Sequence, residues 1–238
     1  MNGSATPERA AWWAAWAVHL YTASGAVLAF LALEAIGRDA YAAAFGWMAL
    51  AMAIDCTDGT LARRARVKQV LPQFDGSKLD DIVDYLNYVF VPIFFAVETN
   101  LLPPGCAGLV AALPLLASAY GFCQSTAKTA DFFFTGFPSY WNITVFYMYV
   151  LHGPPTANAV VFAVLSLLVF VPIGYLYPSR QPFLRPLTIT LGVAWAVVAI
   201  VAVLRLPERS PMLLYGSLAY PIYYFVVSFY LYFGRRWA

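Results

Sequence analysis

Eight apolar segments, separated by short breaks rich in proline or charge, constrain the fold of this chain more than any other feature. They cover residues 12–36, 40–62, 79–102, 107–127, 140–151, 157–177, 187–206 and 213–233. A helix needs about 20 mostly apolar residues to cross a bilayer, and only 11% of the residues of this chain are charged. The sequence therefore predicts an all-α integral membrane protein, a polytopic bundle of about eight transmembrane helices that forms one domain over residues 1–238.

The fifth segment is shorter than an ordinary span, whereas the first is long enough for one. Residues 140–151 are too few for a perpendicular crossing, so we expect them either to be extended by the aromatic stretch at 132–137 or to follow a re-entrant path. The first segment is as long as a full span and lacks a cleavage pattern, so we expect it to remain attached.

The distribution of basic residues predicts the orientation. With the N-terminus in the cytoplasm, 11 of the 14 lysines and arginines fall on the inner side, and only Arg38, Arg205 and Arg209 fall outside. This follows the positive-inside bias and favours an even number of crossings. The net charge of +2 is small and spread over the ends of the spans, so nucleic acid is not an expected partner.

Six of the eight aspartates lie between positions 55 and 84, at the ends of two neighbouring spans. Asp55 and Asp58 are three residues apart and Asp80 and Asp84 four apart, so each pair projects from one helical face. Crowded carboxylates near a membrane repel one another unless protons or cations neutralise them. Because Mg²⁺ and Mn²⁺ prefer oxygen ligands, we predict a divalent-metal site. The alternative is a charged, solvated loop between spans.

These aspartates belong to a longer pattern. Asp55-x-x-Asp58-Gly59-x-x-Ala62-Arg63, followed by Gly76-x-x-x-Asp80-x-x-x-Asp84, resembles the signature of the CDP-alcohol phosphotransferases, with all eight defining positions present. Twelve residues separate Arg63 from Gly76, a longer interval than most of that family has. The longer interval is similar to that of the bacterial phosphatidylcholine synthases, which join free choline to CDP-diacylglycerol.

The resemblance implies a set of roles. Asp55, Asp58 and Asp80 would ligate two Mg²⁺ or Mn²⁺ ions, and Asp84 would touch one ion and act as general base. The cytidine would lie against small residues, with an arginine beside it or beside the carboxylates; these nucleotide-binding positions are Gly59, Ala62, Gly76 and Arg63. The resemblance also implies a six-helix core plus two helices, a homodimer and a bacterial inner membrane. The distribution of basic residues predicts that the aspartates face the cytoplasm. The alternative role of the glycines is close packing between helices, and the alternative role of Arg63 is that of an arginine at the membrane interface.

Residues for the other substrate groups are predicted from chemistry. A quaternary ammonium needs aromatic faces, and Tyr88 lies four residues beyond Asp84, while Tyr140 and Trp141 follow a Gly-x-Pro element. Lys128 and Arg180 are candidates for phosphate or lipid contacts. Packing, an interfacial aromatic belt and interfacial anchoring are the competing interpretations.

The expected function is transfer of the phosphatidyl group of CDP-diacylglycerol to choline, with release of CMP. The same reaction with serine, inositol or glycerol 3-phosphate remains open, which would make the chain a phosphatidylserine, phosphatidylinositol or phosphatidylglycerophosphate synthase. A divalent cation transporter is the alternative from another class. Against it, the acids gather at one membrane face, while Glu34 and Glu98 are expected near the other.

Overall fold

The computed structural model describes residues 5–206, 208 and 210–234. This part of the chain is mostly helical and divides into two compact units, one that extends to Val91 and one that starts at Pro92. The prediction that residues 1–238 form one domain stays a prediction.

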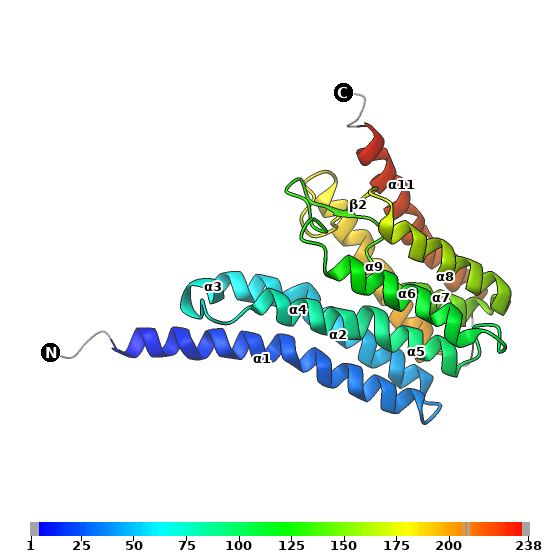
Figure 1. The fold of residues 1–238 in the computed structure, drawn as a ribbon, viewed down its shortest axis with the longest axis horizontal. Coiled ribbons are helices and arrows are strands. Elements are labelled where there is room, and N and C mark those ends of the chain that lie inside the picture. The colour runs from blue at the N-terminus through cyan, green and yellow to red at the C-terminus, as the bar shows by residue number, and fades with distance from the viewer. Residues whose placement is uncertain (1–4, 207, 209, 235–238) are drawn as a thin grey trace. The chain divides into compact units, whose positions relative to one another are not determined.

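The first unit contains the segment rich in aspartate. Its elements are α1 (Ala5–Ile36), α2 (Tyr41–Arg64), α3 (Val67–Val70), α4 (Gly76–Asp84) and the π-helix η1 (Tyr85–Phe90). Helix α1 packs along α2 and α4, as Figure 1 shows.

Small residues allow α1 to approach its neighbours closely, as is common between helices in membranes. Ala29, Ala32 and Ala44 are buried. A Cβ atom at Gly25 of α1 would lie 2.5 Å from Cγ1 of Val83 in α4, so this position tolerates no side chain without a shift. The first unit is therefore held by close helix contacts over the length of α1.

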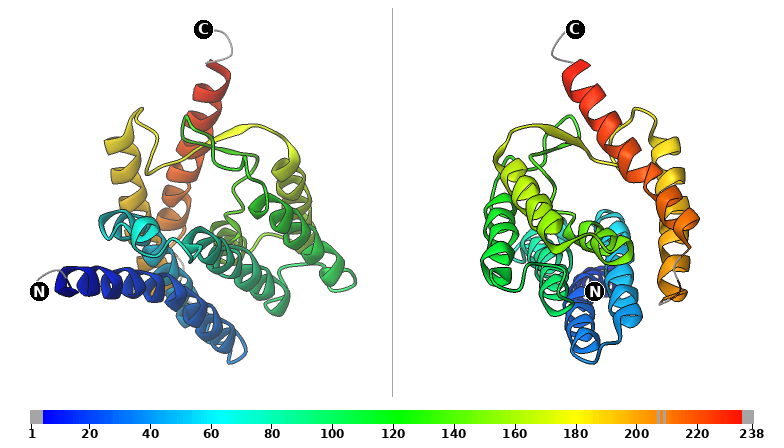
Figure 2. Two further views of the ribbon diagram at one scale, coloured as in Figure 1. Left: turned by 60° about the vertical axis from the view of Figure 1, so that its left-hand side comes forward. Right: turned by 90° about the vertical axis from the view of Figure 1, so that its right-hand side faces the viewer.

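The second unit is larger. Its helices are α5 (Val91–Glu98), α6 (Ala107–Phe122), α7 (Trp141–Leu151), α8 (Pro155–Phe170), α9 (Arg185–Leu204), α10 (Pro211–Ser217) and α11 (Ala219–Gly234). Figure 2 shows α6 and α8 side by side, in agreement with their extensive contact. Trp141, Phe162 and Tyr175 are fully buried and form part of the core of this unit.

A pair of short strands is the one departure from the predicted all-α fold within the described residues. Strands β1 (Phe133–Thr135) and β2 (Gly174–Leu176) pair antiparallel, with Phe134 opposite Tyr175. The apolar segment 157–177 therefore does not stay helical to its end: α8 stops at Phe170, and the last residues join the sheet.

Side chains of α11 satisfy the other edge of β2. The hydroxyl of Ser228 accepts from the main-chain N–H of Leu176 at 3.0 Å, and Tyr224 donates to the carbonyl of Leu176 at 3.0 Å. Buried main-chain groups need such partners, above all where no water is available. Helix α11 thus takes the place of a third strand.

The helices support an integral membrane protein. Among the described residues, three regions are long and apolar enough to cross a bilayer: Glu8–Ile36, Arg185–Leu204 and Pro211–Gly234, the last of which includes α10 and α11. Helices α6, α7 and α8 are apolar but shorter. Five large apolar side chains on these helices are 64% to 77% exposed, as expected of surfaces that face lipid: Leu20, Phe30, Leu116, Leu167 and Leu204. The count of eight spans stays a prediction.

Candidate metal centre

Three of the four predicted metal ligands come together in the first unit. Carboxylate oxygens of Asp55 in α2 and of Asp80 and Asp84 in α4 lie within 4.8 Å of one another, and all three residues are half-buried. A divalent cation with oxygen ligands at about 2.0–2.6 Å holds opposite ligands about 4–5 Å apart. The donor set is all oxygen, which suits Mg²⁺ or Mn²⁺. The group of three therefore fits one such ion.

Asp58, the fourth predicted ligand, lies outside this group of three. It is buried at 5% exposure, and its Oδ2 accepts a hydrogen bond from the hydroxyl of Thr22 in α1 at 2.8 Å. The bond leaves its other carboxylate oxygen for a second partner. The described geometry thus accounts for the ligands of one cation, and the second ion remains a matter of proposal.

Local structure explains why α4 presents two aspartates on one face. Asp75 caps the helix, since its Oδ1 accepts from the N–H groups of Ser77 and Lys78 at 3.1 Å. Asp80 and Asp84 follow at a spacing of four. The π-helix η1 begins directly after Asp84, and single π-helical turns are frequent at functional sites.

Tyr88, predicted to contact choline, has a different contact in the structure. Its side chain is 8% exposed, and its hydroxyl donates to Oδ2 of Asp55 at 2.7 Å. Little of the ring is therefore available for a ligand.

The predicted nucleotide-binding positions differ in how much room they leave. The space beside Gly59 holds only the guanidinium of Arg63, at 3.4 Å from a Cβ atom placed there. Arg63 itself is exposed and donates to Thr60 at 2.9 Å. At Gly76 the corresponding space is filled by the ring of His19, whose Cε1 would lie 2.6 Å from the added atom. Ala62 is half-buried and packs against the small core around Leu71.

The four remaining predicted residues belong to the second unit. Lys128 and Arg180 are exposed, and the guanidinium carbon of Arg180 lies 5.9 Å from the centre of the Tyr177 ring. Tyr140 is half-buried. Trp141 is fully buried and donates to the hydroxyl of Ser118 at 2.8 Å, a placement that favours the packing interpretation.

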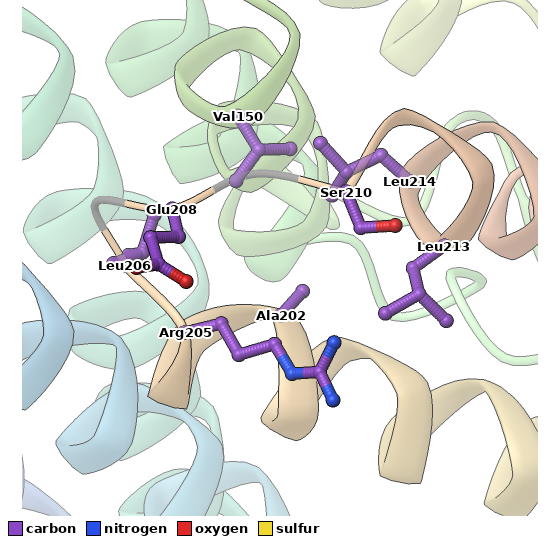
Figure 3. Close-up of a pocket in the computed structure, with 8 residues that line it drawn as sticks. All are labelled: Val150, Ala202, Arg205, Leu206, Glu208, Ser210, Leu213 and Leu214. Atoms are coloured by element: carbon purple, nitrogen blue, oxygen red, sulfur yellow. The ribbon is translucent and has the colours of Figure 1, made fainter.

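Two hollows in the second unit differ widely in volume. The hollow of Figure 3 has a volume of about 10 Å³, room for about one water molecule. Eight residues line it: Val150, Ala202, Arg205, Leu206, Glu208, Ser210, Leu213 and Leu214. A larger hollow of about 210 Å³ lies at the strand pair and includes Asp131, Phe133 and Tyr232 in its lining. The smaller one is too small for choline.

Two contacts of the aspartates were not predicted from the sequence: the bond from Thr22 and the bond from the hydroxyl of Tyr88. The available signal was that both are polar residues inside apolar segments, where such residues usually have partners. That signal does not say which partner a hydroxyl finds.

Helices long and apolar enough to span a bilayer, aspartates suited to a divalent cation and the eight signature positions between Asp55 and Asp84 together indicate the class: integral membrane enzymes of the CDP-alcohol phosphotransferase type. No protein-family model matches the chain. A phosphatidylcholine synthase of Legionella pneumophila is 42% identical over 226 residues, an alignment that covers 92% of this chain and 89% of the relative. A phosphatidylcholine synthase of Pseudomonas aeruginosa is 39% identical, and the alignment covers 90% of this chain and 89% of the relative. A phosphatidylcholine synthase of Rhizobium meliloti is 34% identical, and the alignment covers 91% of this chain and 90% of the relative. The chain belongs to the family of bacterial phosphatidylcholine synthases.

Proposed function

We propose that this protein transfers the phosphatidyl group of CDP-diacylglycerol to choline and releases CMP. The observation that carries the proposal is the similarity to phosphatidylcholine synthases over about nine-tenths of both chains. The group formed by Asp55, Asp80 and Asp84 supports the chemistry, because carboxylates next to a pyrophosphate need cations between them.

The reaction joins the choline oxygen to the phosphatidyl phosphorus. The bond between that phosphorus and the bridging oxygen of the pyrophosphate breaks, and the bridging oxygen leaves with CMP. Bound Mg²⁺ or Mn²⁺ would neutralise the pyrophosphate and stabilise the departing CMP. Asp84 takes the proton of the choline hydroxyl as the new bond forms, which makes a weak nucleophile reactive.

The enzyme would bind two divalent ions. Asp55, Asp80 and Asp84 would hold the first, and the oxygen of Asp58 that does not accept from Thr22 would contribute to the second. Gly59 leaves room for the nucleotide, and Arg63, which lies beside it, contacts the nucleotide or the carboxylates.

The setting of the enzyme is also part of the proposal. The protein has about eight spans, which are a six-helix core and two added helices. In this topology both termini and the aspartates lie at the cytoplasmic face of the bacterial inner membrane. A homodimer is expected from the family resemblance. Candidates for contacts with the lipid phosphate are Lys128 and Arg180. Tyr140 is a candidate for a contact with choline.

A substrate panel tests the function. We expect the purified protein to release CMP and form phosphatidylcholine from CDP-diacylglycerol and choline when Mg²⁺ or Mn²⁺ is present, and to lose this activity in EDTA. Activity with serine, inositol or glycerol 3-phosphate and none with choline would move the assignment to a sister enzyme. Metal flux into liposomes without CMP release would indicate a transporter.

Asp84→Asn tests the general base. The rate should fall about 10²–10⁴-fold, the usual contribution of a positioned base. Asp75→Asn is the matched control, because it removes a charge from the same segment while asparagine still caps the helix. An Asp84→Asn enzyme as fast as the control would remove Asp84 from this role.

A further inference from the structure

Each aspartate of α2 is held by a hydroxyl from a different element of the first unit. Tyr88 of η1 donates to Oδ2 of Asp55 at 2.7 Å, and Thr22 of α1 donates to Oδ2 of Asp58 at 2.8 Å. The two donors come from opposite ends of the unit's sequence, 33 residues after Asp55 and 36 residues before Asp58. Two separate tertiary contacts thus serve the same kind of group.

The contacts have a consequence for metal binding. A carboxylate has two oxygens, so a donor on one oxygen leaves the other to a cation and fixes the direction in which it points. Outer partners of this kind orient metal ligands, and their loss typically lowers metal affinity about 10–100-fold. Tyr88 is 8% and Thr22 is 7% exposed, so water has little access with which to replace either bond.

The burial of Tyr88 favours a role in orienting Asp55 over direct binding of the substrate. An aromatic cage for a quaternary ammonium uses exposed ring faces. The ring of Tyr88 is covered, and its hydroxyl is engaged by Asp55.

We propose that Tyr88 and Thr22 are positioning residues, which hold Asp55 and Asp58 so that one oxygen of each carboxylate is presented to a divalent cation. The inference rests on the proposed function for its role in catalysis, but metal binding tests it without substrate. It assigns to η1 and α1 a part in building a site whose ligands lie on α2 and α4.

The first experiment measures Mn²⁺ binding to the full-length protein in lipid nanodiscs, without substrate, from the electron paramagnetic resonance signal of free Mn²⁺. Tyr88→Phe removes one hydroxyl and keeps the ring, so we expect Mn²⁺ affinity to fall about tenfold or more. Tyr230→Phe, at a tyrosine that is 67% exposed, is the control and should keep the parent affinity.

The second experiment uses Thr22. Thr22→Val keeps the shape and removes the donor, so Mn²⁺ affinity should fall, whereas Thr22→Ser restores the donor and should restore the affinity. Thr156→Val, at an exposed threonine of α8, is the control. In the enzyme assay, Tyr88→Phe and Thr22→Val should need more Mn²⁺ for half-maximal rate.

The outcomes separate this inference from the proposed function. Tyr88→Phe and Thr22→Val proteins whose folded fraction binds Mn²⁺ with the parent affinity would overturn the positioning role, whatever happens to the yield of folded protein. A parent protein that binds no Mn²⁺ would overturn it as well. Loss of affinity in a protein that uses another acceptor than choline would support the positioning role and reject only the proposed substrate.

Discussion

His19 and Gly76 form a contact in which a single methyl group matters. The imidazole of His19 is 95% buried in α1 and fills the space next to the first residue of α4. The same ring lies 4.3 Å from the ring of Phe74, measured between centres. A side chain at Gly76 would therefore force a shift in this helix contact, which supports a packing role for the glycine beside its predicted place at the nucleotide.

Gly76→Ala tests the packing role of this glycine. Overpacking of a close contact costs about 1–3 kcal/mol, and contacting residues show coupling energies of about 0.5–3 kcal/mol. We expect Gly76→Ala to lower the free energy of unfolding in mixed detergent micelles, and Gly76→Ala with His19→Ala to lose less than the sum of the single changes. Gly46→Ala, where the added atom meets nothing within 4 Å, is the control. Strictly additive losses would contradict the contact.

For individual residues, the sequence predicted the clustered aspartates better than their hydrogen-bond partners. The spacing of Asp55, Asp80 and Asp84 was enough to predict a metal site, because helical periodicity places ligands on a face. The partners of Asp55 and Asp58 depend on how helices pack, and hydrophobic patterning does not determine which hydroxyl meets which carboxylate. The buried position of Trp141 has the same cause.

Among the elements, α11 and the strand pair depend on each other. The Oγ of Ser228 accepts from the N–H of Leu176 and donates to the carbonyl of Tyr224. Without this hydroxyl, the N–H of Leu176 would lose the acceptor that α11 provides. The edge of a short sheet would then be left without a partner.

Ser228→Ala tests this dependence. A buried main-chain donor that loses its acceptor costs about 1–3 kcal/mol, so the midpoint of thermal unfolding should fall. Ser179→Ala, at an exposed serine near the same sheet in sequence, is the control and should leave the midpoint unchanged. Equal midpoints for the two variants would show that α11 does not support β2.

The helices were predictable and the strands were not, for a physical reason. Each of the eight predicted apolar segments contains a helix, although residues 140–151 are fewer than a span needs and segment 157–177 ends in β2 rather than in helix. A strand of three residues such as β2 is too short for an alternation of period two to be recognised, so periodicity gives no signal of the change.

Across the whole molecule, the distribution of basic residues predicts which loops face the cytoplasm. In that topology, residues 103–106 lie outside and residues 63–78 inside. Cys106 and Gln73 are exposed residues in these two loops. They are therefore suitable reporters of sidedness.

Labelling of intact cells with a membrane-impermeant maleimide checks this topology. A variant with Cys106 as its only cysteine should react in intact cells. A second variant, with Cys106→Ser and Gln73→Cys as its only cysteine, should react only after the membrane is permeabilised. A variant without cysteine gives the background. The opposite pattern would contradict an active site at the cytoplasmic face.

The packing of α1 along α2 has a consequence for biosynthesis. Helix α1 contains a stretch that is long and apolar enough to cross a bilayer. Helix α2 is 24 residues long, but it contains Asp55, Asp58 and two arginines and is less apolar than a candidate span. The ribosome completes α1 first, so a partner is already in the lipid when the more charged helix emerges. Thr22 is then in place to donate its hydrogen bond to Asp58 when α2 packs against α1.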